Sequence, residues 1–459
     1  MNGITLLLGS IALLVAGYIF YGRYLCRKWG VGELDTATPA HTMEDGIDYV
    51  PAKAPVLMGH HFSSIAGAGP ITGPISAAAA GFGWGACALW IIIGGIFFGG
   101  VHDFGALFAS VRHGGKSIGE IISANMSKRA KRLFIIFAYL TLILVVAAFA
   151  SIVAGTFAAT FVDGAVDYAA SEANARVAMV SILFIVIAVV FGFAVYRRNV
   201  PMGTASVIGV LAIVAIIAIG LNFHPIYLSS TAWMWIVGIY ICVASVAPVW
   251  ILLQPRDYLS SFLLYGMMII AFVGVIGSGA QVELPAFTGW KGIQGNSNLF
   301  PVLFITVACG AVSGFHALIG SGTTAKQLNS EKDAKVIGYG AMIIESALAI
   351  VALIAVGVLF KETNIGGGDK FLLSAPPTIF AGGVATMVAQ MFGGVADFSN
   401  PVYDTVYTLL TLAVSVFALT SLDSGTRLAR YLFAELFVPE GKTRDDLTGA
   451  AKFFSHPLV

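Results

Sequence analysis

Ionisable side chains that could carry protons occur inside or at the edges of apolar stretches of this chain. They are His60, His61, His102, Asp103, His316, Glu345, Asp404 and Asp423. Each is costly in hydrocarbon, so a functional role is the first hypothesis for all of them. Histidine titrates near physiological pH, and a buried glutamate can also exchange protons there. We therefore predict that His61, His316 and Glu345, together with His60, handle a coupling proton.

Charged residues near the ends of the apolar stretches have a more ordinary explanation. Asp103 lies toward the inner end of its stretch, and Asp423 precedes Arg427 by one helical turn. Solvation or ion pairing accounts for such residues. We interpret Asp103, Arg256, Asp423 and Arg427 as gate residues or structural ion pairs. Asp404, at an outer boundary, fits either a structural or a functional role.

Metal-dependent and nucleotide-driven chemistry finds little support in the sequence. His60 and His61 are adjacent and so point to different helix faces, and there is no HExxH pattern. The four cysteines are scattered without CxxC pairing and are typical of small apolar fillers. A P-loop, a Rossmann fingerprint and a nucleophile elbow are also absent. We predict no metal, no cofactor and no catalytic residue, and secondary transport rather than a pump.

The stretch that positions the first two histidines, residues 59–74, contains two Gly-Pro steps. Proline has no backbone N–H and clashes with the carbonyl four residues earlier, so Pro70 and Pro74 deprive Ala66 and Pro70 of helical partners. Irregular backbone at membrane depth is tolerated where it is buried in protein or lines a polar cavity. The stretch predicts either a discontinuous helix lining a binding site or a kinked packing helix, with equal weight.

A second interrupted helix is predicted over residues 309–324, which again combine glycines, hydroxyl side chains and a histidine. Paired Gly-interrupted segments in the two halves of a chain indicate a transporter site built by inverted repeats. The alternative is that Gly310 and Gly314, at GxxxG spacing, only let helices approach closely, as Gly95 and Gly99 would do.

The two segments place a binding site within one transmembrane domain, residues 1–459. We place the first repeat near residues 59–221 and the start of the second near residue 299. Helix N-termini at the interruptions would present backbone N–H groups to a carboxylate of the solute. The predicted solute-binding residues are His60, His61, Ser64, Gly67, Gly69, Ser313, Gly314 and His316.

Composition identifies the class of protein. Of 459 residues, 58% are hydrophobic and 11% are charged, against about 25% charged in ordinary soluble domains. This favours a protein with many membrane spans. The 25 basic and 24 acidic residues nearly balance, which argues against a nucleic-acid partner, because such partners need a concentrated basic face. The first apolar segment lacks a basic start and a cleavage site, so we interpret it as a span.

Eleven apolar windows are long enough to cross about 30 Å of hydrocarbon. They fall near residues 2–21, 63–82, 84–111, 133–162, 177–196, 202–221, 232–253, 259–279, 299–320, 336–360 and 404–423. With the N-terminus outside, 21 of the 25 basic residues fall in cytoplasmic segments and none inside a window, in accord with the positive-inside rule. We predict an all-α polytopic membrane protein of about eleven helices with an outside N-terminus.

Two connections are long. Residues 22–62 predict an acidic cytoplasmic loop that forms an ordered cap, and residues 361–403 predict the largest outer loop. Within the latter, the apolar patch from Thr378 to Met391 indicates a re-entrant or interfacial helix. The basic cluster from Lys128 to Arg132 is interpreted as a topology anchor beside anionic lipid headgroups.

The sequence resembles the carbon starvation protein A (CstA) family of inner-membrane transporters over roughly Asp48 to Arg430. The resemblance rests on blocks in order: Asp48-Tyr49-Val50-Pro51, Gly59-His60-His61-Phe62, Ala66-Gly67-Ala68-Gly69-Pro70, Pro255-Arg256-Asp257-Tyr258-Leu259, Ala308 to Ile319 with Ser321-Gly322-Thr323-Thr324, Gly338-Tyr339-Gly340-Ala341-Met342, Glu345-Ser346, and Leu422-Asp423-Ser424-Gly425-Thr426-Arg427. It implies uptake of peptides, or of pyruvate in some members, driven by protons. It also implies a fold similar to the LeuT-like amino-acid/polyamine/organocation transporters.

Family members usually continue past the segment matching Asp423 to Arg430 with further hydrophobic helices, whereas no apolar window follows it here. We therefore expect either a short member or a truncated one, and a truncated one would lack part of the second repeat. The choices between peptide and pyruvate and between H⁺ and Na⁺, and the oligomeric state, stay open. So do two other classes of function: a membrane-embedded metal-dependent hydrolase using the histidines, and a nutrient sensor without flux.

Overall fold

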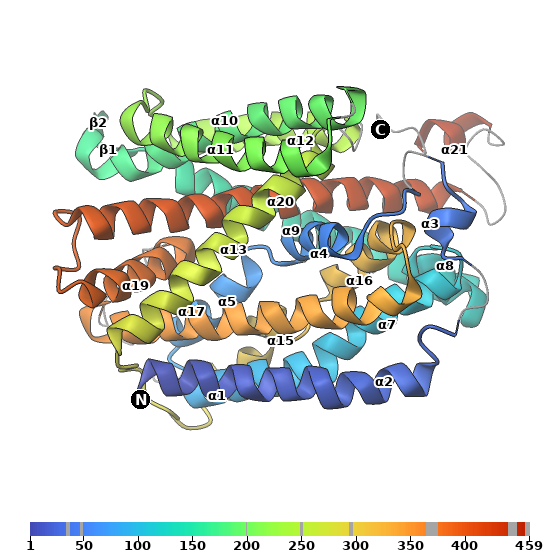
Figure 1. Cartoon of the computed structure of the whole chain (residues 1–459), viewed down its shortest axis with the longest axis horizontal. Coiled ribbons are helices and arrows are strands. Elements are labelled where there is room, and N and C mark those ends of the chain that lie inside the picture. The colour runs from blue at the N-terminus through green and yellow to red at the C-terminus, as the bar shows by residue number, and fades with distance from the viewer. Residues whose placement is uncertain are drawn as a thin grey trace.

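Most of the long helices in the computed structural model run along the long axis of the molecule, with the N-terminus, α19 and the hairpin β1–β2 at one end (Figure 1). The structure describes residues 1–33, 37–45, 49–198, 200–247, 251–292, 297–363, 375–438 and 448–454. Asp48, in the expected cytoplasmic loop, lies outside the described residues. Residues 364–374, in the expected outer loop, do so as well. The prediction of an all-α polytopic membrane protein is confirmed at the level of fold class.

Eight helical segments are long and apolar enough to span a membrane in the part of the chain that is described. They are α1–η1–α2 (Gly3–Ala16, Gly17–Tyr21, Gly22–Trp29), α6–η2–α7 (Trp84–Gly94, Gly95–Gly99, Gly100–Arg112), α9 (Lys128–Phe157), α10 (Tyr168–Arg198), α11 (Met202–Asn222), α13 (Leu253–Ser278), η5–η6–α17 (Glu331–Asp333, Lys335–Gly340, Ala341–Thr363) and α20 (Pro401–Phe437). Each coincides with one of the eleven predicted windows.

The other three windows are not single long helices. The window at 232–253 contains α12 (Ser230–Val246), which has only 17 residues. The window at 63–82 is divided between α4 (Ala54–Ile65) and α5 (Gly69–Ala79). The window at 299–320 is divided among η3 (Leu299–Leu303), α14 (Phe304–Thr306), α15 (Ala308–Ala311) and α16 (Gly314–Gly322). The number of membrane crossings therefore stays a prediction.

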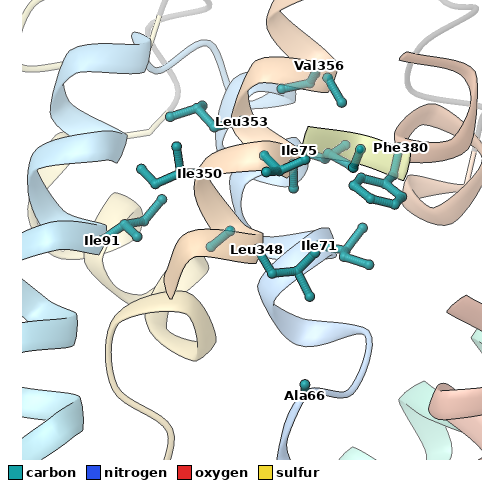
Figure 2. Packing of buried hydrophobic residues seen from close by; sticks show 14 of the residues in the cluster. Ala66, Ile71, Ile75, Ile91, Leu348, Ile350, Leu353, Val356 and Phe380 are labelled. Atoms are coloured by element: carbon teal, nitrogen blue, oxygen red, sulfur yellow. The ribbon is translucent and has the colours of Figure 1, made fainter. Parts of the chain in front are cut away.

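The interruption between α4 and α5 has a clear local cause. Ala66 adopts φ −72° and ψ 60°, which ends α4, and Pro70 starts α5 at a first-turn position where a missing N–H is harmless. Pro74, in contrast, lies inside α5 without ending it, so the interruption occurs at the first Gly-Pro step and not at the second. Figure 2 shows Ala66 on the non-helical connection and Ile71 and Ile75 on the helix that follows.

The core forms around α5. Its Ile71 and Ile75 are fully or almost fully buried, and they pack in one cluster with Leu353 of α17 and Phe380 of α19 (Figure 2). α19 (Pro376–Met391) has twelve buried residues and packs against α13, α17 and α20. Of the two expected alternatives, the interfacial helix is wrong, because a helix on the membrane surface would leave one face exposed. The re-entrant helix stays a prediction.

Three helices contain π-helical segments that pack against one another. They are η1, η2 and η6, and the wide turn of a π segment frees carbonyls from the regular pattern. The carbonyl of Ile96 in η2 accepts a 2.9 Å hydrogen bond from the Tyr339 hydroxyl of η6. A Cβ added to Gly100 would lie 2.5 Å from the same tyrosine ring. This contact fixes α7, which begins at Gly100, against the start of the α17 helix.

The connection between α2 and α4 is shorter than predicted, because residues 22–29 and 54–62 are helical. Its described part is held in place as an ordered cap. The Thr38 hydroxyl donates to the carbonyl of Leu328 at 2.5 Å, and the Ala52 amide donates to Gln327 at 2.9 Å. The short helices α3 (Pro39–Thr42), η4 (Thr324–Lys326) and α8 (Ile118–Asn125) lie at this end of the bundle with α21 (Gly449–Phe454) (Figure 1).

One small hairpin departs from the helical pattern. Strands β1 (Thr160–Val162) and β2 (Ala165–Asp167) pair antiparallel, with Phe161 opposite Val166. The turn is Asp163-Gly164, and both residues have positive φ, 51° and 80°, as a two-residue hairpin turn of this kind requires. The predicted span at 133–162 therefore ends earlier, at Phe157.

Candidate functional site

The two helix interruptions meet inside the bundle. The first lies between Ile65 and Gly69, and the second lies at Val312, whose backbone is extended between α15 and α16. A Cβ added to Gly69 would lie 2.6 Å from the Cβ of Cys309. Glycine at this position therefore lets the start of α5 touch α15, and both interruptions face one region of the protein.

A cavity of about 740 Å³ lies where the interruptions meet, and we call it the central cavity. Its wall comes from both interrupted helices, from α7, from the apolar side of α9, and from Glu345 of α17. Most of the lining is apolar, including Ile65, Phe149 and Leu318. Apolar pockets with a few convergent polar groups are typical of small-molecule sites.

The structure divides the predicted solute-binding residues into two groups. Five lie in the wall of the central cavity: Gly67, Gly69, Ser313, Gly314 and His316. The other three, His60, His61 and Ser64, lie on α4 and are buried outside that wall.

His316 forms the centre of a buried ionisable cluster, which we call the His316 triad. Its Nδ1 lies 2.7 Å from Oδ2 of Asp103, and its Nε2 lies 3.2 Å from Oε2 of Glu345. All three side chains are at most 1% exposed. Both ring nitrogens thus face carboxylates, an arrangement that suits the imidazolium form, in which both nitrogens are donors. His102 approaches the other Asp103 oxygen at 2.8 Å.

Glu345 is the less constrained member of the triad. Its contact with His316 is close but lacks the alignment of a hydrogen bond, and neither of its oxygens has a hydrogen-bond partner among the described residues. A buried carboxylate without partners is costly when ionised. Glu345 also lies in the cavity wall, so it is the member best placed to gain and lose a proton when the contents of the cavity change.

His61 does not belong to the triad. Its Nδ1 lies 2.8 Å from the Thr324 hydroxyl, whereas the adjacent His60 approaches Oδ2 of Asp257 at 3.2 Å. The two neighbouring imidazoles thus point to different helix faces, as predicted. Ser64 donates to the same Asp257 oxygen at 3.2 Å, which makes Asp257 the shared partner of α4.

Arg256 and Asp423 form a buried ion pair between α13 and α20. The Tyr240 hydroxyl of α12 donates to Asp423 at 2.8 Å. Asp423 therefore pairs with Arg256 rather than with Arg427, its neighbour one turn away. Arg427 instead donates to the carbonyls of Ala244 and Ala247 at the end of α12, at 3.0 and 2.6 Å, where a cation complements the helix dipole.

These arginines correct part of the predicted topology. Arg256 is fully buried within a spanning helix, and Arg427 is only 5% exposed. The prediction that these basic residues lie in loops is wrong, because internal partners replace water. Asp404, by contrast, is half-buried and pairs with Arg176 at 2.8 Å near the helix end.

Three site residues were not predicted: Asp257, Tyr240 and Thr324. Asp257 follows Arg256 at the start of a span, so its position resembled a loop. Asp257 and Thr324 lie in blocks that carry the family resemblance, which gave them no individual role, and Tyr240 is a polar group in an apolar segment. The role of each becomes recognisable from partners more than a dozen residues away in the chain.

A second cavity of about 520 Å³ lies beside the central one, and we call it the end cavity. It is lined by Lys116, Ser117, Lys326 and Glu435 among others, so it is more polar. Ile118 and Leu318 border both cavities. Within the described residues, no group of three or more His, Cys, Asp or Glu side chains is placed to hold a metal ion.

Interrupted helices, a buried ionisable triad and a cavity that touches both are features expected of a membrane transporter. The sequence pattern of the carbon starvation protein CstA family matches residues 2–369 and 367–454, so the chain belongs to this family. The relatives are named as transporters rather than enzymes. No solved structure matches the chain.

Three relatives illustrate the match. The peptide transporter CstA of Bacillus subtilis is 33% identical over 96% of this chain and 77% of its own length. The peptide transporter CstA of Campylobacter jejuni is 35% identical over 95% of the chain and 66% of its length. The pyruvate/proton symporter BtsT of Escherichia coli is 32% identical over 97% of the chain and 69% of its length. The chain thus spans about two thirds to three quarters of the length of these relatives.

Replacing Arg256 by methionine is expected to destabilise the protein strongly, because the buried carboxylate of Asp423 would lose its paired cation. The expected loss is about 3–5 kcal/mol, read as a lower apparent Tm of the purified protein in detergent. The double variant Arg256→Met, Asp423→Leu should recover part of that loss. Arg176→Met is the matched control, since it opens a partly exposed pair worth about 1 kcal/mol or less. Equal effects of R256M and R176M would contradict this account.

Gly310 and Gly314 should respond differently to substitution. A Cβ at Gly310 would lie 2.6 Å from the Cβ of Ala349, whereas nothing lies within 4 Å of one at Gly314. Gly310→Val is expected to destabilise by about 1–3 kcal/mol through overpacking. Gly314→Val should leave the apparent Tm near that of the wild type, yet impair solute binding by filling the cavity. Similar melting shifts in both variants would favour a purely packing role for the pair.

Proposed function

We propose that this protein is a secondary active transporter that imports a small carboxylate-bearing nutrient, a peptide or pyruvate, together with protons. The observation that carries the proposal is the His316 triad in the wall of the central cavity. The names of the relatives, peptide transporters and a pyruvate/proton symporter, support the same class of solute. Nutrient limitation is the condition that the family name suggests.

The solute carboxylate would bind at the helix N-termini of the interruptions. The first turns of α5 and α16 both reach the cavity wall, through Gly69 and Gly314. First-turn N–H groups lack partners within their helix, and the helix dipole favours an anion there. The hydroxyls of Thr72 and Ser313 lie in the same wall. A cavity of this volume accommodates pyruvate or a short peptide.

The coupling proton would bind at the triad. With Asp103 and Glu345 ionised and His316 protonated, the triad carries one net negative charge, which burial disfavours. Protonation of Glu345 removes that charge. An anionic solute in the cavity would strengthen the preference for the protonated form, because two nearby negative charges repel. Binding of solute and proton would thereby favour each other, as symport requires. His61 would assist from α4.

The order of helices supports inverted repeats. An interrupted helix, a helix with a π segment, a short helix and a long helix occur as α4–α9 and again as η3–α20. Packing between the two sets is reciprocal: α5 packs against α17, α16 packs against α7, and the long helices α9 and α20 pack together. This pattern supports a LeuT-like arrangement of two repeats of opposite orientation.

The proposed location is the inner membrane with the N-terminus outside. The basic ends of α2 and the region around α8 lie at the end of the molecule opposite the N-terminus (Figure 1). Positively charged ends remain on the cytoplasmic side during insertion.

In proteoliposomes with an acidic exterior, the wild type is expected to accumulate labelled solute above equilibrium. Glu345→Gln cannot release a proton, so its accumulation should fall at least tenfold at a gradient of about one pH unit. Exchange of internal for external solute should persist, because exchange needs no net proton movement. Asp404→Asn is the control carboxylate and should retain accumulation. Wild-type uptake that ignores the pH gradient would refute the coupling.

The solute is identified by competition. Unlabelled dipeptides, tripeptides and pyruvate are each added in excess to labelled uptake, with an amidated peptide as the control that lacks a carboxylate. Inhibition by peptides or by pyruvate, but not by the amidated control, is the expected result. If none of the carboxylates competes, the proposed solute class is wrong.

A further inference from the structure

A second buried ionisable cluster lies apart from the His316 triad, and we call it the Asp257 cluster. It consists of His60 and Ser64 of α4, Arg256 and Asp257 of α13, and Asp423 of α20. Arg256 and Asp257 are 0% exposed, and Asp423 is 2% exposed. None of the five borders the central cavity. The proposed solute site therefore assigns no function to the Asp257 cluster.

The fixed charges of the Asp257 cluster do not balance. Arg256 is the shared cation: it pairs with Asp423 and lies 3.9 Å from Oδ1 of Asp257. The next cation, Arg427, is directed to the carbonyls of α12 and makes no described ion pair with Asp423. One guanidinium thus faces two carboxylates. A net negative charge buried in this way is strongly unfavourable, so one further positive charge is needed.

His60 is the group that can supply that charge. Its Nδ1 lies 3.2 Å from Oδ2 of Asp257. Neither ring nitrogen of His60, nor Oδ1 of Asp257, has a hydrogen-bond partner among the described residues.

The remaining polar groups around the cluster are already committed. The Tyr240 hydroxyl donates to Asp423, Ser63 donates to the carbonyl of Asp257, and His61 turns away to Thr324. These bonds leave His60 as the titratable group that faces Asp257.

We propose that the His60–Asp257 pair binds a second coupling proton, separate from the one at the His316 triad. This inference rests on the proposed function of proton-driven uptake. The proton comes from water, binds an imidazole nitrogen of His60, and gives the cluster zero net charge. On release it returns to water. A hard cation such as Na⁺ prefers a shell of several oxygen ligands, whereas the group facing Asp257 here is a nitrogen base.

A short segment links this proton site to the solute site. Ser64 touches Asp257, its carbonyl accepts from the Ser421 hydroxyl at 3.4 Å, and Gly67 packs against the same serine. Gly67 and Gly69 then enter the wall of the central cavity. The non-helical residues 66–68 thus connect the Asp257 cluster to the central cavity over a few residues. Movement of α5 on solute binding would shift Ser64 relative to Asp257. Solute binding would thereby affect binding of the second proton.

The test is the number of protons per solute, measured as the accumulation ratio in proteoliposomes with the membrane potential clamped to zero. A gradient of about one pH unit should give about 100-fold accumulation with two protons and about tenfold with one. His60→Gln removes the base without adding a charge, and Asp257→Asn removes the carboxylate. Both variants should fall to the one-proton ratio, while Asp404→Asn should stay at the two-proton ratio.

The outcomes separate this inference from the proposed function. A tenfold ratio in the wild type would overturn the second proton site and leave proton-coupled uptake intact. No accumulation in the wild type would overturn the coupling itself. A His60→Gln variant that keeps the 100-fold ratio would also overturn the assignment. If neither variant folds, as judged by its apparent Tm, the wild-type ratio alone decides.

Discussion

The position of the His316 imidazole between two carboxylates is the interaction on which the rest of the structure depends. Asp103 comes from α7, His316 from α16 and Glu345 from α17, so one buried ring ties together three helices far apart in the chain. In hydrocarbon such groups are stable only when they satisfy one another. The contact therefore fixes the position of α16 in the bundle. It also fixes the extended residue Val312, which precedes α16 in the wall of the central cavity.

Close approach of backbones makes this geometry possible. A Cβ at Gly99 would lie 2.3 Å from the carbonyl of Ala311, and one at Gly95 would lie 2.2 Å from the Ser346 hydroxyl. Gly95 thus lets η2 approach α17, and Gly99 lets η2 approach α15, as the packing interpretation of their spacing predicts. Gly310 is also in close contact, but Gly314 behaves differently, because open space lies beside it. The same spacing therefore serves helix packing at three glycines and leaves space at the fourth.

The sequence predicted an interrupted second helix and gave an interrupted helix as one of two interpretations of residues 59–74, since prolines and glycines have local costs that a single chain reveals. It also singled out His316 and Glu345 as proton-handling candidates and interpreted Asp103 as a gate residue or a structural ion pair. It did not identify His316 as the partner of Asp103. It placed Arg256 in a loop and overlooked Asp257 beside it. Their roles depend on Asp423 and His60, more than 160 residues away in each case. Periodicity carries no information about such long-range pairs.

The interfacial alternative for the helix at residues 378–391 is wrong for a related reason. An apolar patch in a long connection is compatible with a membrane surface or with a protein interior, and only the packing of α13, α17 and α20 around it decides between them. The same limit applies to α12, whose Ser230–Val246 helix is shorter than its apolar window. Local composition shows that a segment tends to be buried. The tertiary structure determines whether lipid or protein surrounds it.

Ile118 and Leu318 stand between the central cavity and the more polar end cavity. Branched aliphatic side chains in that position oppose the passage of ions, because an ion crossing them would lose its hydration shell without replacement. If the proposed proton-coupled uptake uses both cavities, these two side chains would limit leakage of protons between them. The efficiency of such uptake would then depend on how briefly the two side chains separate.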